Sequence, residues 1–464
     1  MLQDNYLLLP LTISLIIFLV LFIYYQYQGF DIKTKNNFIN VNQQLDTPLL
    51  DAFGRMRTSN PVIIFESKQI NDNDFLFWDE KLYSGSGLSS IYESTRSSTT
   101  LYNDIGATGK YIRQTYRNFD YRPGKSQLIM MTANLLRKYP SSLSLPGASI
   151  GLGNYDDDNG LFFLYDVDKM YVVIRNNKTD TKISQHNWNI DTMDGKGPSK
   201  IIANWNKVQI YTIDYAWLGV GRVRFCLIIN GINYPVHEFN NANELSSVYM
   251  NSPNNPLRLE LTVDNVNYGV SSEIICTSVT TEGGANTEAG IIRTLSHNET
   301  LTTPSNLTNF YLLQAFRLKE NSKTTVIPKS VHYFNLTAEN NNVSTEWQLI
   351  FNPEYDIPIP EDNWQSINNG SLEYYHPSEG SCIVSSGTSS VVLINGYTNS
   401  NGKKGNGNGE NVNILVSNLL ILGQGISTPS QKPVRNTLAI VSKKIKDDGN
   451  NEVDVRSSLT WKEL

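Results

Sequence analysis

The chain has 464 residues but only three cysteines and five histidines, and charged residues make up no more than 18% of it. Cys226, Cys276 and Cys382 are an odd number and lie too far apart in the sequence for a disulfide framework or a paired metal site. We therefore expect reduced, buried thiols. The histidines show no pair at metal-ligand spacing. The sequence thus predicts neither a metal site nor a cofactor site.

Sequence motifs of common enzyme classes are also missing. The chain holds no G-x-S-x-G, Walker or dinucleotide-binding fingerprint. A net charge of -6 argues against the basic surface of a nucleic-acid-binding protein. Two carboxylates from distant strands, as glycoside hydrolysis requires, would leave no local signature. We predict that the protein is not an enzyme and binds no nucleic acid.

One long apolar run lies near the N-terminus. Residues 7–25 read LLLPLTISLIIFLVLFIYY, and no charged residue occurs between Asn5 and Phe30. About 20 such residues in a helix span the ~30 Å hydrocarbon core of a bilayer. We therefore predict a short tail over residues 1–5 and a transmembrane helix over residues 6–27. The side chains expected to anchor it are Leu7, Leu15, Ile16, Phe18, Leu21 and Tyr24.

The residues around this run bear on two questions, cleavage and orientation. A cleaved signal peptide is the rival interpretation, but no Lys or Arg precedes the run and no small-residue cleavage site follows it. Lys33 and Lys35 follow the run, whereas only Asp4 precedes it. The positive-inside rule then places the larger C-terminal part on the cytosolic side of a host membrane.

After a polar linker over residues 28–46, alternation of apolar and polar residues dominates the chain. In residues 257–264 (LRLELTVD) every second side chain is apolar, which predicts a half-buried antiparallel strand. Asn-Gly pairs at 159, 230, 369 and 395 predict turns. Other strand-like runs lie at residues 170–175, 208–217, 222–229, 391–394, 412–422 and 437–441.

Many short strands separated by turns predict a mainly β fold. The predicted fold class is an N-terminal transmembrane helix followed by two antiparallel β-sandwich domains of jelly-roll or concanavalin-like type. The domains are expected over residues 47–285 and 286–464, because residues 283–288 are the least hydrophobic candidate boundary between them.

Two local clusters combine charge with other features. Asp156–Gly160 (DDDNG) resembles the start of a calcium loop, but Gly160 stands where an EF-hand needs Asn or Asp. We predict a tight acidic turn and leave weak Ca²⁺ binding open. Arginines and aromatics interleave between Tyr111 and Lys125. Such a mixture can bind anionic partners, but it more often marks a solvated strand face or a protein interface.

One segment is distinctive, since residues 51–61 read DAFGRMRTSNP. It resembles the DAFGR-x-R-x-S-x-P opening of a family of phage and giant-virus virion structural proteins. The resemblance implies a component of a virus particle and supplies no catalytic residue. Further stretches resemble the same family, in order, at residues 112–127, 156–163, 188–199, 213–225, 236–243 and 459–464.

The motif residues have a structural interpretation. A glycine between Phe53 and Arg55 lets the chain turn where a side chain would obstruct it. Two glycines after Trp217 suit a tight connection between strands, packed beneath the indole. We expect these residues to define the fold and an interface: Asp51, Phe53, Gly54, Arg55, Arg57, Trp217, Gly219 and Gly221.

The apolar run and the resemblance together predict a minor capsid protein of a large DNA virus. Its helix would lie in the internal viral membrane, or in a host membrane during assembly, and its β-domains would bind other capsid proteins, tethering the membrane to the shell. The expected partners are the lipid bilayer and the major and minor capsid proteins, and a homo-oligomer is left open. The alternative is a particle-surface attachment protein with a lectin-like sandwich that binds glycans. A membrane-tethered glycan hydrolase is the weakest hypothesis.

Overall fold

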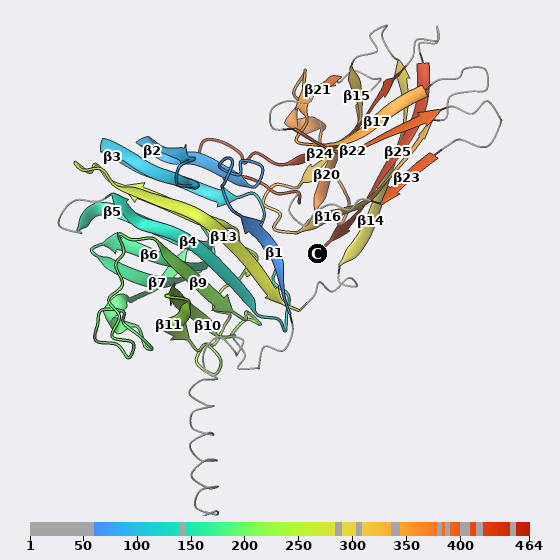
Figure 1. The fold of residues 1–464 in the computed structure, drawn as a ribbon. Helices are drawn as coiled ribbons and strands as arrows, with labels where there is room; N and C mark the ends of the chain where they lie inside the picture. The colour runs from blue at the N-terminus through green and yellow to red at the C-terminus, as the bar shows by residue number, and fades with distance from the viewer. Residues whose placement is uncertain are drawn as a thin grey trace, which may run out of the picture. The chain divides into compact units, whose positions relative to one another are not determined.

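The described residues fold almost entirely as antiparallel β-strands in the computed structural model (Figure 1). Their only helices are two 3-10 turns, Gln185–Asn187 and Glu361–Asn363. The prediction of a mainly β fold is confirmed. The structure describes residues 60–138, 144–283, 290–302, 309–335, 344–377, 383–385, 390–399, 409–413, 421–445 and 452–464.

The predicted fold class needs one correction, which concerns the transmembrane helix. Within the part of the chain that the structure describes, no helix is long and apolar enough to cross a membrane. Apolar residues alternate there with polar ones, a pattern that builds half-buried strands and not apolar helices. The predicted helix over residues 6–27 and the linker over residues 28–46 lie outside the described residues.

The first group of strands lies between Pro61 and Glu282 and forms one continuous sheet. Its order is β11-β10-β9-β4-β13-β3-β12-β5-β6-β7-β8, with β1 beside β13 and β2 beside β3. The strands are β1 Pro61–Ser67, β2 Trp78–Glu93, β3 Ser98–Thr115, β4 Gln127–Lys138, β5 Leu145–Tyr155, β6 Gly160–Val167, β7 Lys169–Asn176, β8 Thr179–Ser184, β9 Gln209–Tyr215, β10 Val223–Ile229, β11 Ile232–Phe239, β12 Leu257–Val263 and β13 Ser271–Glu282.

This sheet curls into two layers that share a core. The long strand β3 pairs with β13 over Thr99–Tyr102 and with β12 over Gly109–Gln114, so it connects the layers. Phe163 of β6 contacts Tyr211 of β9 and Phe225 of β10, with ring centroids 5.1 and 5.2 Å apart. These strands are not neighbours in the sheet, so the contacts cross the interior of a β-sandwich.

The second group of strands lies between Ile291 and Glu463 and forms two sheets. One has the order β14-β25-β16-β23, and the other has β18-β21-β15-β24-β17-β22, with β20 beside β15 and β19 beside β20. The strands are β14 Ile291–Thr302, β15 Phe310–Leu318, β16 Val326–Asn335, β17 Ser344–Phe351, β18 Glu354–Tyr355, β19 Gln365–Ser366, β20 Leu372–Tyr375, β21 Ile383–Ser385, β22 Val391–Asn399, β23 Gly409–Asn413, β24 Thr437–Lys444 and β25 Glu452–Glu463.

These two sheets also pack face to face. The rings of Phe316 on β15 and Trp461 on β25 lie 5.9 Å apart, and those of Tyr333 on β16 and Trp347 on β17 lie 5.7 Å apart. Both tryptophans are almost completely buried. Residues 59–464 nevertheless form one compact unit. The domain boundary at residue 285 stays a prediction, and residues 284–289 lie outside the described residues.

The predicted strands at residues 170–175, 208–217, 222–229, 391–394 and 437–441 overlap β7, β9, β10, β22 and β24. Asn230-Gly231 forms the predicted turn, with φ of 53° and 78°. One detail was wrong. Asn395-Gly396 lies inside β22, because both residues pair in register with β17. The predicted strand at residues 412–422 overlaps β23 at Val412 and Asn413, and its residues 414–420 lie outside the described residues.

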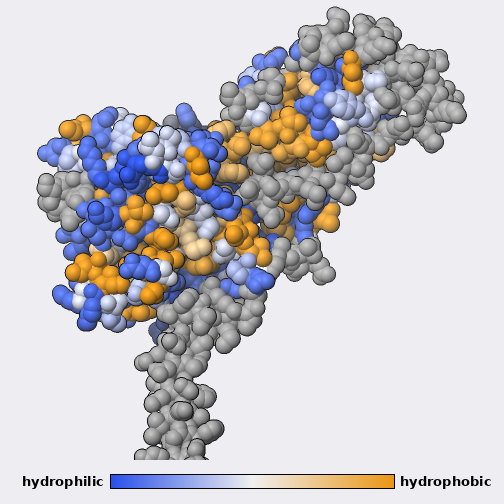
Figure 2. Space-filling model, in the orientation of Figure 1, coloured by the Kyte–Doolittle hydropathy of each residue, from blue (hydrophilic) through white to orange (hydrophobic). Residues whose placement is uncertain are grey.

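The surface carries scattered apolar side chains. Figure 2 shows hydrophobic residues interspersed with hydrophilic ones on the visible face. Ile105 and Ile202 are the extreme cases among the residues described, with 76% and 74% of their surface exposed. Isolated exposed apolar residues are ordinary in soluble domains. A polar cleft is the more informative feature of this chain.

Candidate functional site

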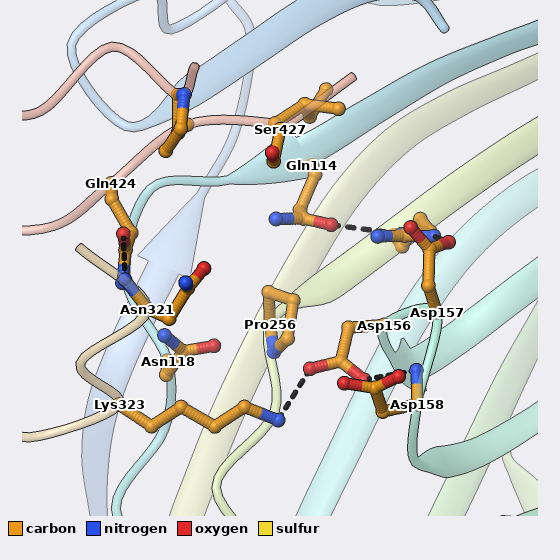
Figure 3. Close-up of a pocket in the computed structure, with 14 residues that line it drawn as sticks. Gln114, Asn118, Asp156, Asp157, Asp158, Pro256, Asn321, Lys323, Gln424 and Ser427 are labelled. Carbon is orange, nitrogen blue, oxygen red and sulfur yellow. Dashed lines mark hydrogen bonds and ion pairs between the residues drawn. The ribbon is translucent and has the colours of Figure 1, made fainter. Parts of the chain in front are cut away.

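The cleft has a volume of about 240 Å³ and is lined by residues that lie far apart in the sequence (Figure 3). One side, the first wall, comes from β3, the β5–β6 turn and β12. The opposite side, the second wall, comes from residues 321–323 and 424–427, with Pro433. Concave sites lined by a few fixed polar groups are the usual place for ligand binding.

The β5–β6 turn is the most ordered part of the first wall. Oδ1 of Asp156 accepts hydrogen bonds from the N–H groups of Asp158 (2.9 Å) and Asn159 (2.8 Å), and the Asp156 N–H donates to the Asn159 carbonyl (2.8 Å). Asp side chains favour such turns because they replace a backbone acceptor. The acidic run therefore forms a tight turn. No cluster of His, Cys, Asp or Glu among the described residues could hold a metal ion.

Two stacked aromatic rings, at the end of β5 and in β6, pack next to this turn. The rings of Tyr155 and Phe162 stack with centroids 4.2 Å apart. The Arg258 guanidinium lies 5.3 Å from the Tyr155 ring, and the Arg175 guanidinium lies 4.9 Å from the Phe162 ring. Arg175 Nη1 also donates to the Asp156 carbonyl (3.1 Å). Stacking and cation–π contacts thus fix the turn on the sheet.

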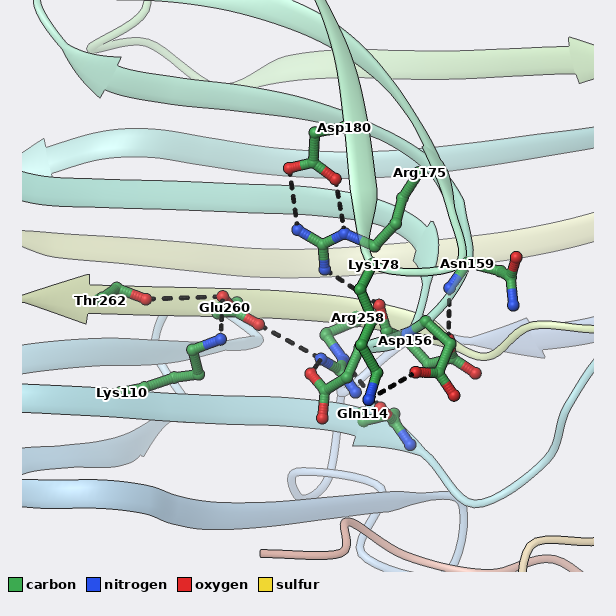
Figure 4. A network of polar contacts seen from close by, with 12 residues as sticks. Lys110, Gln114, Asp156, Asn159, Arg175, Lys178, Asp180, Arg258, Glu260 and Thr262 are labelled. Carbon is green, nitrogen blue, oxygen red and sulfur yellow. Dashed lines mark hydrogen bonds and ion pairs between the residues drawn. The ribbon is translucent and has the colours of Figure 1, made fainter. Parts of the chain in front are cut away.

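Arg258 is the centre of the charge network on this wall (Figure 4). Its Nη1 contacts Asp157 Oδ1 at 2.7 Å and Glu260 Oε2 at 3.3 Å, and its Nε donates to Gln114 Oε1 at 2.8 Å. Burial alone would lower the pKa of Arg258, but the two carboxylates outweigh burial and raise it. Burial alone would raise the pKa of Asp157, but Arg258 outweighs it and the pKa is lowered. Both groups therefore stay charged near neutral pH.

The second wall reaches the first through Lys323. Its ammonium group forms an ion pair with Asp156, across the cleft. Nearby, the Gln424 side chain holds the local turn, because its Nε2 donates to the Ser322 carbonyl (2.6 Å) and its Oε1 accepts from the Asn321 N–H (3.0 Å). Each of these polar side chains has a fixed orientation.

Residues 422–427, which we call the strap, bind the edge of the first sheet. The Gln424 N–H donates to the Tyr116 carbonyl (3.0 Å), and the Ile426 N–H donates to Asp79 Oδ2 (2.7 Å). Lys81 Nζ donates to the Ile426 carbonyl (3.2 Å). Burial raises the pKa of Asp79, although the Ile426 N–H and Lys81 act against this shift. A few polar contacts therefore position this part of the second wall.

Three polar groups in the cleft have no such partners. The side-chain amides of Asn118 and Asn321 and the hydroxyl of Ser427 make no hydrogen bond with any residue that the structure describes. Figure 3 shows the two asparagines beside Lys323, with Pro256 between them and the turn at Asp156. An amide offers two donors and an acceptor, and a hydroxyl offers both functions. These groups can accept a polar ligand without breaking an internal bond.

None of the residues predicted to be functional is among the described residues that line this cleft. The predicted anchor residues Leu7, Leu15, Ile16, Phe18, Leu21 and Tyr24 lie outside the described residues. So do the motif residues Asp51, Phe53, Gly54, Arg55 and Arg57.

Trp217, Gly219 and Gly221 lie in the connection between β9 and β10, away from the cleft lining. Trp217 Nε1 donates to the Met250 carbonyl (2.7 Å), and the Gly221 N–H donates to the Trp217 carbonyl (2.7 Å). Gly219 has a φ of +80°, which favours glycine. The connection is compact, and its side chains serve the fold.

The basic and aromatic stretch from Tyr111 to Lys125 was misinterpreted. Arg113 is completely buried, forms an ion pair with Glu80 and lies 4.7 Å from the Trp78 ring. Phe119 is also completely buried. The sequence predicts a solvated face or an interface here, because it does not show that other parts of the chain cover Arg113 and Phe119. From this stretch, Gln114 and Asn118 reach the cleft.

The sequence also gives no sign of two contacts between distant segments, a histidine stack and the second wall. His297 and His376 lie 79 positions apart in the sequence, but their rings stack with centroids 3.8 Å apart. Asn321, Lys323, Gln424 and Ser427 form the second wall as isolated polar residues with no motif around them. Only Asp156–Asp158 carried a local signal.

Cys226 is a buried free thiol, as predicted, Cys276 is partly buried, and Cys382 lies outside the described residues.

No protein-family model matches the chain, and no curated protein matches it. Among similar solved structures is an endo-1,3-beta-glucanase from Streptomyces sioyaensis (9% identity over 50% of this chain and 99% of that chain, TM-score 0.35). Another is a legume lectin-like domain from Entamoeba histolytica (14%, 48% and 99%, TM-score 0.29). A third is the CBM2 module of an evolved Dit from Lactobacillus casei BL23 phage J-1 (7%, 49% and 99%, TM-score 0.33). Likeness at this level assigns the chain neither a family nor a function.

Proposed function

We propose that the unit formed by residues 59–464 binds glycans in the cleft between the first and second walls. The observation that carries the proposal is the convergence of three unpartnered neutral groups, on Asn118, Asn321 and Ser427, in one concave site. Sugar hydroxyls both donate and accept hydrogen bonds, so amide and hydroxyl side chains complement them.

The walls of the cleft support binding because they are held in place before any ligand arrives. The turn at Asp156 is fixed by its own backbone bonds and by Arg175, and Gln424 is fixed by two hydrogen bonds. A site whose walls are already ordered loses less conformational entropy when it binds. Preorganisation of this kind raises affinity without additional contacts.

The electrostatics favour binding over hydrolysis. A glycoside hydrolase needs one carboxyl group with a raised pKa to protonate the leaving oxygen. In this cleft the pKa of Asp157 is lowered, and Asp156 is held in an ion pair with Lys323. Asp157 therefore does not suit the role of a general acid. That the protein is not an enzyme stays a prediction.

The resemblance of several segments to virion structural proteins supports placing this binding unit on a virus particle. The second candidate function, a capsid component without glycan binding, depends on that resemblance alone. Immunogold labelling of intact purified particles separates the two roles. An attachment protein is expected to be accessible on the particle surface, whereas a component between membrane and shell becomes accessible only after the shell is opened.

A glycan array probed with the purified full-length chain tests the proposal directly. We expect at least one class of glycan to bind, and Asn118→Ala to weaken that binding about three- to tenfold through the loss of one or two hydrogen bonds. Asn240→Ala is the matched control, because Asn240 is exposed and lies outside the cleft lining. The proposal fails when no glycan binds, or when both variants change binding equally.

A further inference from the structure

The charged side chains of the cleft are already paired with one another. Lys323 contacts Asp156, and Arg258 contacts Asp157. The lining holds three carboxylates, Asp156, Asp157 and Asp158, against these two cations, which is an excess of one negative charge. No lining cation of the described cleft is therefore left to pair with a ligand anion.

Three cations around the cleft also have carboxylate partners. Lys110 pairs with Glu260 at 3.0 Å, and Arg175 pairs with Asp180 at 2.7 Å. Lys178 lies 3.6 Å from Asp158, where both side chains are more than half exposed. The cations near the cleft already pair with carboxylates, so an anionic ligand would lie beside those carboxylates without a cation of its own. Like charges in close contact cost several kcal/mol.

The size of the cleft limits the ligand further. Sites for drug-sized ligands have volumes of ~300–1,000 Å³, and the cleft of about 240 Å³ lies just below this range. The groups free to bind, on Asn118, Asn321 and Ser427, are all neutral. A small neutral unit with several hydroxyls matches both the volume and the chemistry.

We infer that the cleft accepts the terminal sugar of an uncharged glycan and discriminates against sugars that carry a carboxylate, sulfate or phosphate group. The inference rests on the proposed function, because it names the class of glycan that the same cleft takes. It also assigns a role to the ion pair between Lys323 and Asp156. By neutralising the only lysine in the lining, Asp156 prevents that lysine from binding an anionic sugar.

The experiment compares five array glycans on the full-length chain, which end in a neutral hexose, an N-acetylhexosamine, sialic acid, glucuronic acid or a sulfated hexose. We expect the neutral terminal sugars to bind at least about tenfold more tightly than the anionic ones. We also expect this binding to change little with ionic strength, because no net charge is paired on binding. Preferential binding of the anionic sugars would overturn the inference and leave the proposed function intact. Absence of binding to every glycan would overturn the proposed function itself.

A substitution makes the test sharper. Asp156→Asn keeps an oxygen that accepts from the N–H groups of Asp158 and Asn159, but it releases Lys323. We expect affinity for the anionic sugars to rise about tenfold in this variant. Asp166→Asn is the control, since Asp166 pairs with Lys182 in an exposed contact of 3.9 Å on the same sheet. An unchanged preference in Asp156→Asn would contradict the role assigned to the ion pair, and the wild-type comparison stands without either variant.

Discussion

The two walls of the cleft are built in different ways. The first wall consists of neighbouring strands and one hairpin turn, and buried contacts around Arg258 hold it together. The second wall consists of two segments about a hundred positions apart, which reach the first sheet through single hydrogen bonds and the ion pair of Lys323. The first wall is therefore part of the sandwich, whereas the second wall is attached to it.

Because the walls differ, substitutions in them are expected to have different effects on stability and on binding. Changes in the first wall disturb paired strands and buried charges, so they are expected to lower the free energy of unfolding. Changes in the second wall disturb a few single polar contacts, so they are expected to affect the shape of the cleft more than the stability of the unit. Substitutions in each wall test whether stability and binding are separated in this way.

The largest effect is expected from Arg258→Met. Arg258 is only 3% exposed and compensates Asp157 and Glu260. Removing it leaves Asp157 without its cation, whereas Glu260 keeps Lys110 at 3.0 Å. Because Asp157 is 40% exposed, we expect a loss near the lower end of the about 3–5 kcal/mol that breaking a buried pair costs. Urea unfolding followed by circular dichroism measures the loss.

The control for this substitution is Lys182→Met. Lys182 pairs with Asp166 on the same sheet at 3.9 Å, and both side chains are exposed by more than a third. Exposed pairs contribute about 0–1 kcal/mol. An equal loss of stability in the two variants would mean that the first wall is not held by its buried charge network.

A smaller effect is expected from alanine at two glycines, one in β5 behind the first wall and one in the strap. At Gly153 a Cβ would lie 2.3 Å from the Leu161 carbonyl oxygen and 2.5 Å from the Phe162 Cα, so β5 and β6 would have to separate. At Gly423 a Cβ would lie 2.3 Å from the Tyr116 carbonyl oxygen, so the strap would have to shift away from this carbonyl. Overpacking costs about 1–3 kcal/mol. We expect Gly153→Ala near the upper end of this range and Gly423→Ala near the lower end.

Thermal unfolding and glycan affinity should be measured on both alanine variants. We expect Gly423→Ala to lose more affinity than stability, because its wall moves while the sandwich stays folded. The comparison between the walls is wrong if Gly423→Ala unfolds more easily than Gly153→Ala.

Much of the fold could be predicted from local patterns. Alternation identified β12, and the Asn230-Gly231 pair identified the β10–β11 turn, because period and turn chemistry are properties of neighbouring residues. The burial of Arg258 could not be predicted in this way. Alternation assigns it to the polar face of β12, and only the tertiary structure brings Asp157 and the Tyr155 ring over that face.

The site was predictable on one side alone. The acidic run at Asp156 predicts a turn, so the sequence indicates the part of the first wall that Asp156–Asp158 form. Asn321 and Ser427 had none, since a single Asn or Ser in a turn-rich chain is ordinary. Their functional interest arises from long-range packing that brings the two segments together, and such packing leaves no pattern in a single sequence.

The smallest effect is expected from Asp79→Asn, which tests how the strap is held. An Asn oxygen can still accept from the Ile426 N–H, so stability at pH 7 should stay within about 1 kcal/mol of the wild type. Burial raises the pKa of Asp79 in the folded state, so the fold favours the protonated carboxyl. That contribution is complete below the ordinary pKa of 3.8 and is lost as the pH rises through the folded-state value. Urea unfolding at several pH values should therefore show the wild type gaining stability relative to Asp79→Asn as the pH falls from 7 toward 4. Parallel pH profiles for the two proteins would show that the Asp79 carboxylate is well solvated and that the strap does not bury it.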